Sequence, residues 1–131
     1  MEAARLDPSW NRPPTEIGII LTNAGFLEEA EEAFAQAQRV AEDWDHFHHA
    51  RGVNRYWRGR FAEAGECLRR ALQLEPKRMD SKAVLLACLE QLFPAGTQEI
   101  RSLRKELEHE AGPNWRELIP RPRRGTVPRG Y

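Results

Sequence analysis

The amino-acid sequence predicts an all-α fold in which antiparallel helix pairs stack on one another, with about six helices in total. Three features lead to this prediction. Residue types recur with a period of 34 positions, apolar residues follow three- and four-residue spacing, and glycine or proline residues separate the apolar stripes. A period of this length holds two helices and a turn, and such a unit buries its apolar face only against neighbouring units.

The repeat becomes visible when the sequence is shifted against itself by 34 residues. The shift also places Leu27 on Phe61 and Phe34 on Leu68, so apolar bulk recurs in the same register. Small residues recur as well, and these allow helix axes to approach closely. The identical pairs are Gly18 and Gly52, Gly25 and Gly59, Glu29 and Glu63, Ala30 and Ala64, Glu32 and Glu66, and Ala37 and Ala71.

Residues 11–44 predict the first helix pair. Pro13 and Pro14 suit the first turn of a helix that ends before Gly25. The second helix carries a run of glutamates near its N-terminus, which we interpret as a solvated face that complements the helix dipole, with an acidic binding patch as the alternative. Its apolar stripe is Leu27, Ala30, Phe34, Ala37 and Ala41, and the glutamates are Glu28, Glu29, Glu31 and Glu32.

Residues 45–78 predict the second pair, with one helix over about 45–58 and another over about 60–75. Gly59 separates the two helices, and Pro76 stops the second one. The apolar stripe of the second helix is Phe61, Ala64, Leu68, Ala71 and Leu72.

Residues 79–112 predict a third pair that lacks the glycine and alanine pattern and is therefore a degenerate or capping pair. Ser81 and Thr97 are expected to cap its two helices. Residues 1–10 are interpreted as the remnant of a preceding repeat or an N-terminal cap. Residues 113–131 form a basic tail rich in proline and arginine, with one short docking turn expected at 114–119.

These residues resemble the tetratricopeptide repeat family over about 100 of the 131 residues. The second unit matches best, at Gly52, Gly59, Phe61, Ala64, Leu68, Ala71 and Pro76. It departs from the family pattern at His48, Arg51 and Arg55, where large apolar or aromatic residues are usual. The resemblance implies a short right-handed superhelix whose first helices line a concave surface that binds peptides or protein segments.

Tyr56 and Trp57 are the residues we expect to anchor a ligand in that groove, because large aromatic side chains supply much contact area. The alternative is a rotated helix in which Phe47, Ala50 and Trp57 form the core, while Arg51, Arg55 and Arg58 face solvent. The groove residues that the resemblance implies are Arg12, Thr15, Ile19, Thr22, Asn23, His46, His49, Val53, Tyr56 and Trp57.

The expected function is that of a non-enzymatic scaffold for protein–protein interaction, with no catalytic residues, no cofactor and no metal. The sequence has no glycine-rich phosphate loop, no nucleophile elbow and no HExxH motif. His46 and His49 lie one helical turn apart, but two imidazoles are too few ligands for a metal site. A close acid and histidine pair in one pocket would point back to an enzyme.

The charge balance, 20 basic against 20 acidic residues, hides a segregation along the chain. Residues 11–44 are acidic, whereas residues 45–78 and 113–131 are basic. An alternative function is therefore a nucleic-acid-associated protein that uses the basic second unit and the arginine-rich tail. The tail could instead fold back onto the acidic first unit or dock on a neighbouring molecule, and homo-oligomers through the end repeats are a further option.

The remaining features concern the cellular compartment of the protein. Cys67 and Cys88 lack metal or disulfide spacing and are expected to be reduced and buried. The longest apolar stretch, residues 83–89, is far too short to span a bilayer. We therefore expect a cytoplasmic protein without membrane contact.

Overall fold

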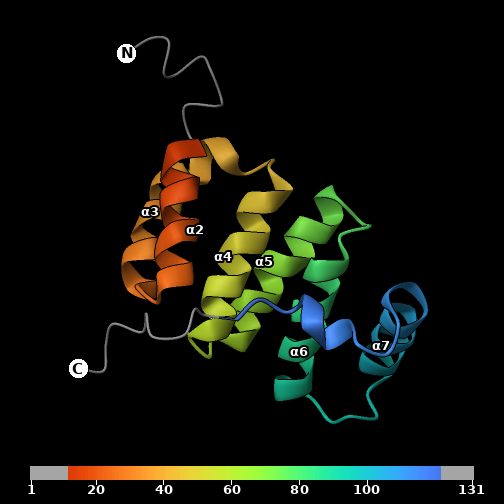
Figure 1. Cartoon of the computed structure of the whole chain (residues 1–131). Coiled ribbons are helices and arrows are strands. Elements are labelled where there is room, and N and C mark those ends of the chain that lie inside the picture. The colour runs from red at the N-terminus through yellow and green to blue at the C-terminus, as the bar shows by residue number, and fades with distance from the viewer. Residues whose placement is uncertain (1–11, 122–131) are drawn as a thin grey trace.

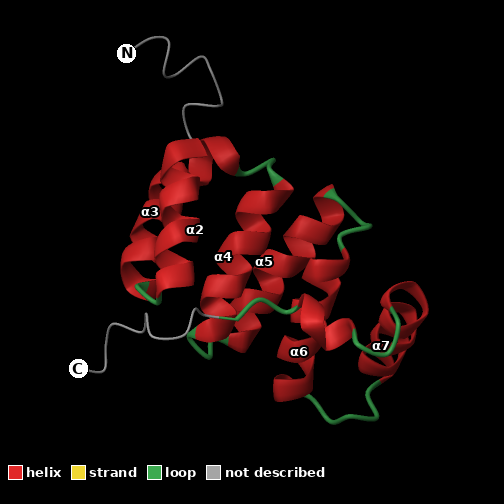
Figure 2. Cartoon of the chain, viewed as in Figure 1, coloured by secondary structure: helices red, strands yellow, loops and turns green. Residues whose placement is uncertain are grey.

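The computed structural model describes residues 12–121, and within this range it contains helices and turns but no strand (Figure 2). The all-α fold class is confirmed, and the two helices of the second pair agree with the expected ranges, 45–58 and 60–75, to within one residue at each end. The elements are α2 (Arg12–Ala24), α3 (Leu27–Ala41), α4 (Asp45–Trp57), α5 (Phe61–Leu74), α6 (Met79–Leu92), α7 (Gln98–Ala111) and a 3-10 helix, η2 (Trp115–Leu118). The expected remnant at residues 1–10 lies outside the described residues.

The α-helices pack as three consecutive pairs, α2 with α3, α4 with α5 and α6 with α7 (Figure 1). Successive pairs are joined by contacts between α3 and α4 and between α5 and α6. The first helices of the pairs also touch in series, α2 with α4 and α4 with α6. They therefore form a continuous row, which is the arrangement expected of stacked repeats.

Two glycines spaced by the repeat period set the closeness of the helices within the first two pairs. A Cβ atom on Gly18 would lie 2.6 Å from the ring of Phe34, and one on Gly52 would lie 2.8 Å from Leu68 Cγ. Both distances are shorter than real Cβ contacts, so only glycine fits there while the helices keep their spacing. Gly18 and Gly52 are thus close-packing positions, and Phe34 and Leu68 fill the space they leave.

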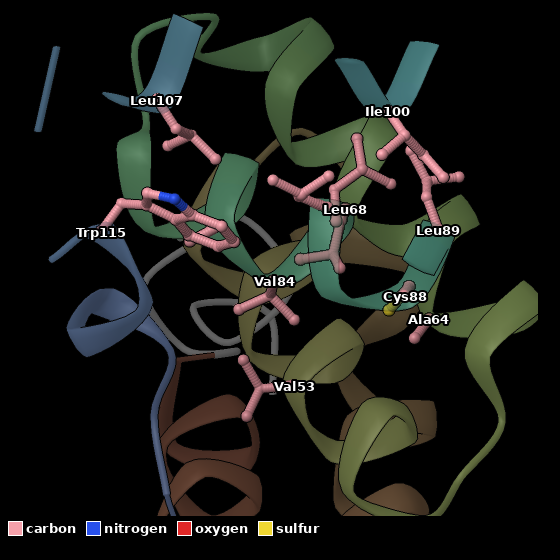
Figure 3. Close-up of a cluster of buried hydrophobic side chains, with 12 residues drawn as sticks. Val53, Ala64, Leu68, Val84, Cys88, Leu89, Ile100, Leu107 and Trp115 are labelled. Atoms are coloured by element: carbon pink, nitrogen blue, oxygen red, sulfur yellow. The ribbon is translucent and has the colours of Figure 1, made fainter. Parts of the chain in front are cut away.

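The apolar interior is divided into two clusters. The first core lies in the first pair and α4, and consists of Ala30, Phe34, Ala37, Ala41, Phe47 and Ala50. The second core is larger, and Figure 3 shows it gathered around α6, with Trp115 and Leu107 on one side and Leu89 and Cys88 on the other. Its buried members are Val53, Ala64, Leu68, Ala83, Val84, Leu85, Leu86, Cys88, Leu89, Ile100, Leu107 and Trp115.

The two expected helix caps differ from the structure. Helix α6 begins at Met79, so Ser81 lies inside the helix, where its side chain is fully buried and serves a tertiary contact instead. Thr97 does precede α7, but its hydroxyl donates to the carbonyl of Pro94 at 2.7 Å rather than capping the helix. A polar residue near a predicted start can satisfy a different partner once the chain folds.

Two further expectations concern the cysteines and the membrane. Cys67 and Cys88 are both free thiols and both buried, as predicted. Burial raises the pKa of Cys88 to about 12, so this thiol stays protonated at neutral pH. Among the described helices, none has the length and apolar character needed to cross a bilayer.

Candidate binding groove

A cavity of about 150 Å³ opens between α2 and α4, on the row formed by the first helices of the pairs. Its wall combines apolar side chains with an amide, a hydroxyl and two imidazoles, and the C-terminal segment closes one edge. The lining residues are Ile19, Thr22, Asn23, His46, His49, Ala50, Val53 and Pro120.

Most of the residues that the resemblance placed on the concave surface meet at this cavity, namely Ile19, Thr22, Asn23, His46, His49 and Val53. Thr15 does not belong to the lining, because its side chain is fully buried in the helix packing. Arg12 begins α2, and its side chain is outside the part of the chain that the structure describes.

The two aromatic residues expected as ligand anchors lie elsewhere. Tyr56 is half-buried and meets Phe61 edge to face, with ring centroids 5.8 Å apart. Trp57 is also half-buried and packs against the second core, while its indole Nε1 donates to the carbonyl oxygen of Pro120 at 3.0 Å. Neither residue lines the cavity; Trp57 instead holds the C-terminal segment at its edge.

The floor of the groove contains a buried histidine joined to α6. His49 Nδ1 lies 2.8 Å from the hydroxyl of Ser81, and His49 Nε2 lies 3.4 Å from Asp80 Oδ2. A carboxylate beside Nε2 favours the tautomer with the proton on Nε2, which leaves Nδ1 to accept the hydroxyl hydrogen of Ser81. Burial is the main reason that the pKa of His49 falls to about 4, so the ring is neutral at physiological pH.

This group of serine, histidine and aspartate contains the close acid and histidine pair that would point to an enzyme, but its geometry serves packing. The Ser81 side chain is fully buried, so its hydroxyl lies within the helix packing and not at the surface of the groove. Asp80 is also held by Arg78, whose guanidinium lies 2.8 Å from Asp80 Oδ2. The cluster therefore joins α4 to α6, and it shows why Ser81 is placed inside the helix.

A second polar cluster joins α3 to α4. Arg51 Nε donates to Glu31 Oε2 at 2.8 Å, and Arg55 donates to the same oxygen at 3.0 Å. Burial raises the pKa of Glu31, but the hydrogen bonds and charges of Arg51 and then Arg55 outweigh it, and the pKa is lowered from its usual value. Glu31 is thus an exception to the predicted solvated acidic face.

This cluster also explains two departures from the family pattern. Arg51 and Arg55 occupy places where apolar residues are usual, and they do not face solvent as the rotated-helix alternative would require. On the same helix, Phe47, Ala50 and Val53 are buried. Charge pairing with Glu31 across the helix contact takes the place of apolar packing.

Asn54 is a fully buried residue that sequence reasoning missed. Its side-chain amide donates to the hydroxyl of Thr22 at 3.0 Å and to the carbonyl oxygen of Leu27 at 2.9 Å. It therefore ties α4 to the turn between α2 and α3 beneath the groove. An asparagine inside an amphipathic helix gives no sequence signal for such a partner more than 25 residues away.

The groove shows no metal geometry in the range 12–121. No group of three or more histidine, cysteine, aspartate or glutamate side chains there could hold an ion. His46 and His49 stack with ring centroids 6.4 Å apart, and His49 already contacts Ser81 and Asp80.

Residues 46–78 match the model of the family described as Tetratricopeptide repeat. The match spans α4 and α5, the pair in which the sequence pattern was strongest. No curated protein shows a significant match to the chain. No solved structure does so either.

Proposed function

We propose that this chain, whose residues 46–78 match the tetratricopeptide repeat family, acts as a non-enzymatic interaction module that holds a protein segment in the groove between α2 and α4. Tetratricopeptide repeats are in general protein-interaction modules. Their stacked first helices form an extended surface suited to a peptide.

The observation that carries the proposal is the composition of the cavity wall. Residues that the family resemblance implies for the concave surface, from two successive first helices, line one common cavity. Ile19 and Val53 offer apolar contact, whereas Asn23 and His46 offer hydrogen bonds to a peptide backbone. Burial, and next the positive charge of Arg78, lower the pKa of His46, which favours a neutral ring that both donates and accepts.

The alternative of nucleic-acid binding is less well supported, because many of the arginines in the basic second unit already pair with carboxylates. Such arginines have less charge to offer to phosphates. The pairs are Arg51 and Arg55 with Glu31, Arg60 with Glu63, Arg69 with Glu99, Arg70 with Asp43, and Arg78 with Asp45 and Asp80.

Affinity capture from nuclease-treated lysate tests the proposal with a matched pair of variants on α2. Ile19→Arg places a charge in the groove, whereas Ile17→Arg places the same charge on a side chain that is 50% exposed and outside the groove. We expect wild type and Ile17→Arg to retain a protein partner that Ile19→Arg loses, with circular dichroism showing all three folded. Equal capture by both variants, or capture that requires intact nucleic acid, would contradict the proposal.

A further inference from the structure

The C-terminal segment of this chain returns to the groove from the far end of the molecule. After α7 the chain forms η2, which packs on α6 and α7 and buries Trp115 to 3% exposure. Leu118 and Ile119 then pack against the second core. From there the described backbone runs back to the C-terminal end of α4 (Figure 1).

Two observations fix the end of this path at the groove. The carbonyl oxygen of Pro120 accepts the hydrogen bond from Trp57 Nε1, a contact between residues 63 positions apart. Pro120 is itself part of the cavity wall, together with Ile19 and Asn23 of α2 and residues of α4. The described chain therefore reaches the edge of the cavity at Pro120, and Arg121, the last described residue, is exposed beside it.

The backbone is extended at Ile119, where it leads into this segment. Ile119 is extended, with φ −79° and ψ 120°, as expected of a residue that precedes proline. Arg121 also precedes a proline, Pro122, so the same preference continues. Extended proline-rich backbone makes no internal hydrogen bonds, which leaves its carbonyl groups free for donors such as the indole of Trp57.

Charge and length favour the remaining residues as the occupant. Residues 121–131 carry four arginines and no acidic residue. The first pair carries acidic residues for them to approach, Glu16 on α2 and six more on α3 or in the turn after it. The ten residues after Arg121 can reach roughly 30 Å in an extended proline-rich conformation. Helix α2, with 13 residues, is about 20 Å long, so the segment is long enough to follow it.

We propose that the groove between α2 and α4 is the docking site for the chain's own C-terminal segment, residues 120–131, which binds it in cis and competes with a partner peptide. The competition rests on the proposed function, but the docking does not. Trp57, expected from the sequence as an anchor for a foreign ligand, serves here as the anchor for this internal one. A partner must then displace a basic, proline-containing segment to reach the cavity.

A synthetic peptide of residues 120–131, acetylated and fluorescently labelled, tests the docking by fluorescence anisotropy. The receptors are the full chain and a chain that ends at Ile119, which keeps Trp115 and Leu118 in the second core. We expect the peptide to bind the truncated chain and to bind the full chain at least about tenfold more weakly, because a tethered copy acts at roughly millimolar effective concentration. Raising the salt concentration from roughly 50 mM to roughly 500 mM should weaken binding several-fold.

Variants of the truncated chain locate the site. Ile19→Arg should abolish peptide binding, whereas the exposed control Ile17→Arg should leave it within about twofold of the unmodified truncated chain. Trp57→Phe keeps an aromatic ring but removes the donor to Pro120, and should weaken binding several-fold. A peptide with its four arginines replaced by glutamine should bind more weakly and lose the salt dependence.

Three outcomes would overturn the docking proposal: no binding to the truncated chain, equal binding to both chains, or equal loss in the two isoleucine variants. Sedimentation equilibrium adds a fourth, since a full chain that dimerises while the truncated chain stays monomeric would place the segment in a second copy. Partner capture that depends on Ile19 but not on truncation would leave the proposed function standing while the docking fails. Peptide binding without any captured partner would leave the docking standing while the proposed function fails.

Discussion

The first and second cores hold equivalent helix pairs together by different means. In the first core, small alanines surround two rings, Phe34 and Phe47, which meet edge to face with centroids 6.0 Å apart. In the second core, leucine, valine and isoleucine side chains dominate and Trp115 closes the cluster from outside the repeats. The same stacked geometry is therefore compatible with a core that depends on a few large residues and with one that shares its packing widely.

The two regions also differ in their polar contacts. The poorer first core is supplemented by Glu31 with its two arginines and by Asn54 with its bonds to Thr22 and Leu27. These groups lie where apolar side chains would otherwise join α3 to α4. The comparison suggests that the first pair is the more easily separated part of the molecule, because buried ion pairs stabilise less than well-packed apolar contacts.

The prediction with the largest expected effect concerns Phe34, the central ring of the first core. We expect Phe34→Ala to lower the free energy of unfolding by about 3–5 kcal/mol, since the alanines around it cannot fill the cavity. Amide hydrogen exchange should accelerate in α2 and α3 before α6 and α7. Leu86→Ala in the second core is the control, because it should accelerate exchange in α6 and α7 instead. Earlier exchange in α6 and α7 than in α2 and α3 of the Phe34→Ala protein would contradict the contrast.

The contact between α4 and α6 is sensitive to pH because it contains His49. The unfolded chain binds a proton at this histidine near pH 6.5, whereas the folded chain binds it only near pH 4. The unfolded state therefore holds more protons between these values, and stability falls as the pH drops from about 6.5 to about 4, by on the order of 3 kcal/mol.

Urea unfolding at several pH values measures this loss. His49→Gln keeps an amide donor and acceptor but cannot titrate, so its stability should change less over the same range. Parallel pH profiles for wild type and the variant would show that His49 does not carry the effect.

The repeated glycines distinguish the two pairs more finely. Gly18→Ala meets the rigid ring of Phe34, whereas Gly52→Ala meets the aliphatic side chain of Leu68, which can change rotamer more easily than a ring. We therefore expect a loss of about 2–3 kcal/mol for the first and about 1–2 kcal/mol for the second. Gly65→Ala is the matched control, because its added Cβ would lie 3.7 Å from Leu85 in ordinary contact. This change should stabilise α5 by about 0.5–1 kcal/mol.

Thermal unfolding of the three glycine variants gives the ranking. A Gly18→Ala protein as stable as wild type would mean that the first pair adjusts its helix spacing freely.

The smallest effect concerns the ion cluster between α3 and α4. Glu31→Leu leaves Arg51 and Arg55 half-buried without their carboxylate, and should cost about 1–2 kcal/mol given their partial exposure. The triple replacement of Glu31, Arg51 and Arg55 by leucine should recover most of this loss. Chemical denaturation of both proteins decides the point, and a triple variant weaker than Glu31→Leu would show that the charges hold the pair better than apolar contacts.

Local patterns in the sequence predicted much of this structure. Helix ranges followed from apolar spacing with glycine and proline boundaries, and the family match falls on the pair where those signals agree. The family resemblance also implied many of the residues that line the cavity, including Ile19, His46 and Val53. The buried polar contacts were harder to predict from the sequence, because Ser81 resembled a helix cap and Glu31 resembled one solvated acid among several.

By itself, the sequence determined the repeat period, the all-α class, the positions where glycine permits close packing and the burial of both cysteines, since these depend on residue size and spacing along one helix or one period. The tertiary structure decided which charges find partners and which side chains reach the groove. Contacts such as Arg51 with Glu31 and Trp57 with Pro120 join residues 20 and 63 positions apart. Their energy depends on the relative placement of separate helices, which no local pattern encodes.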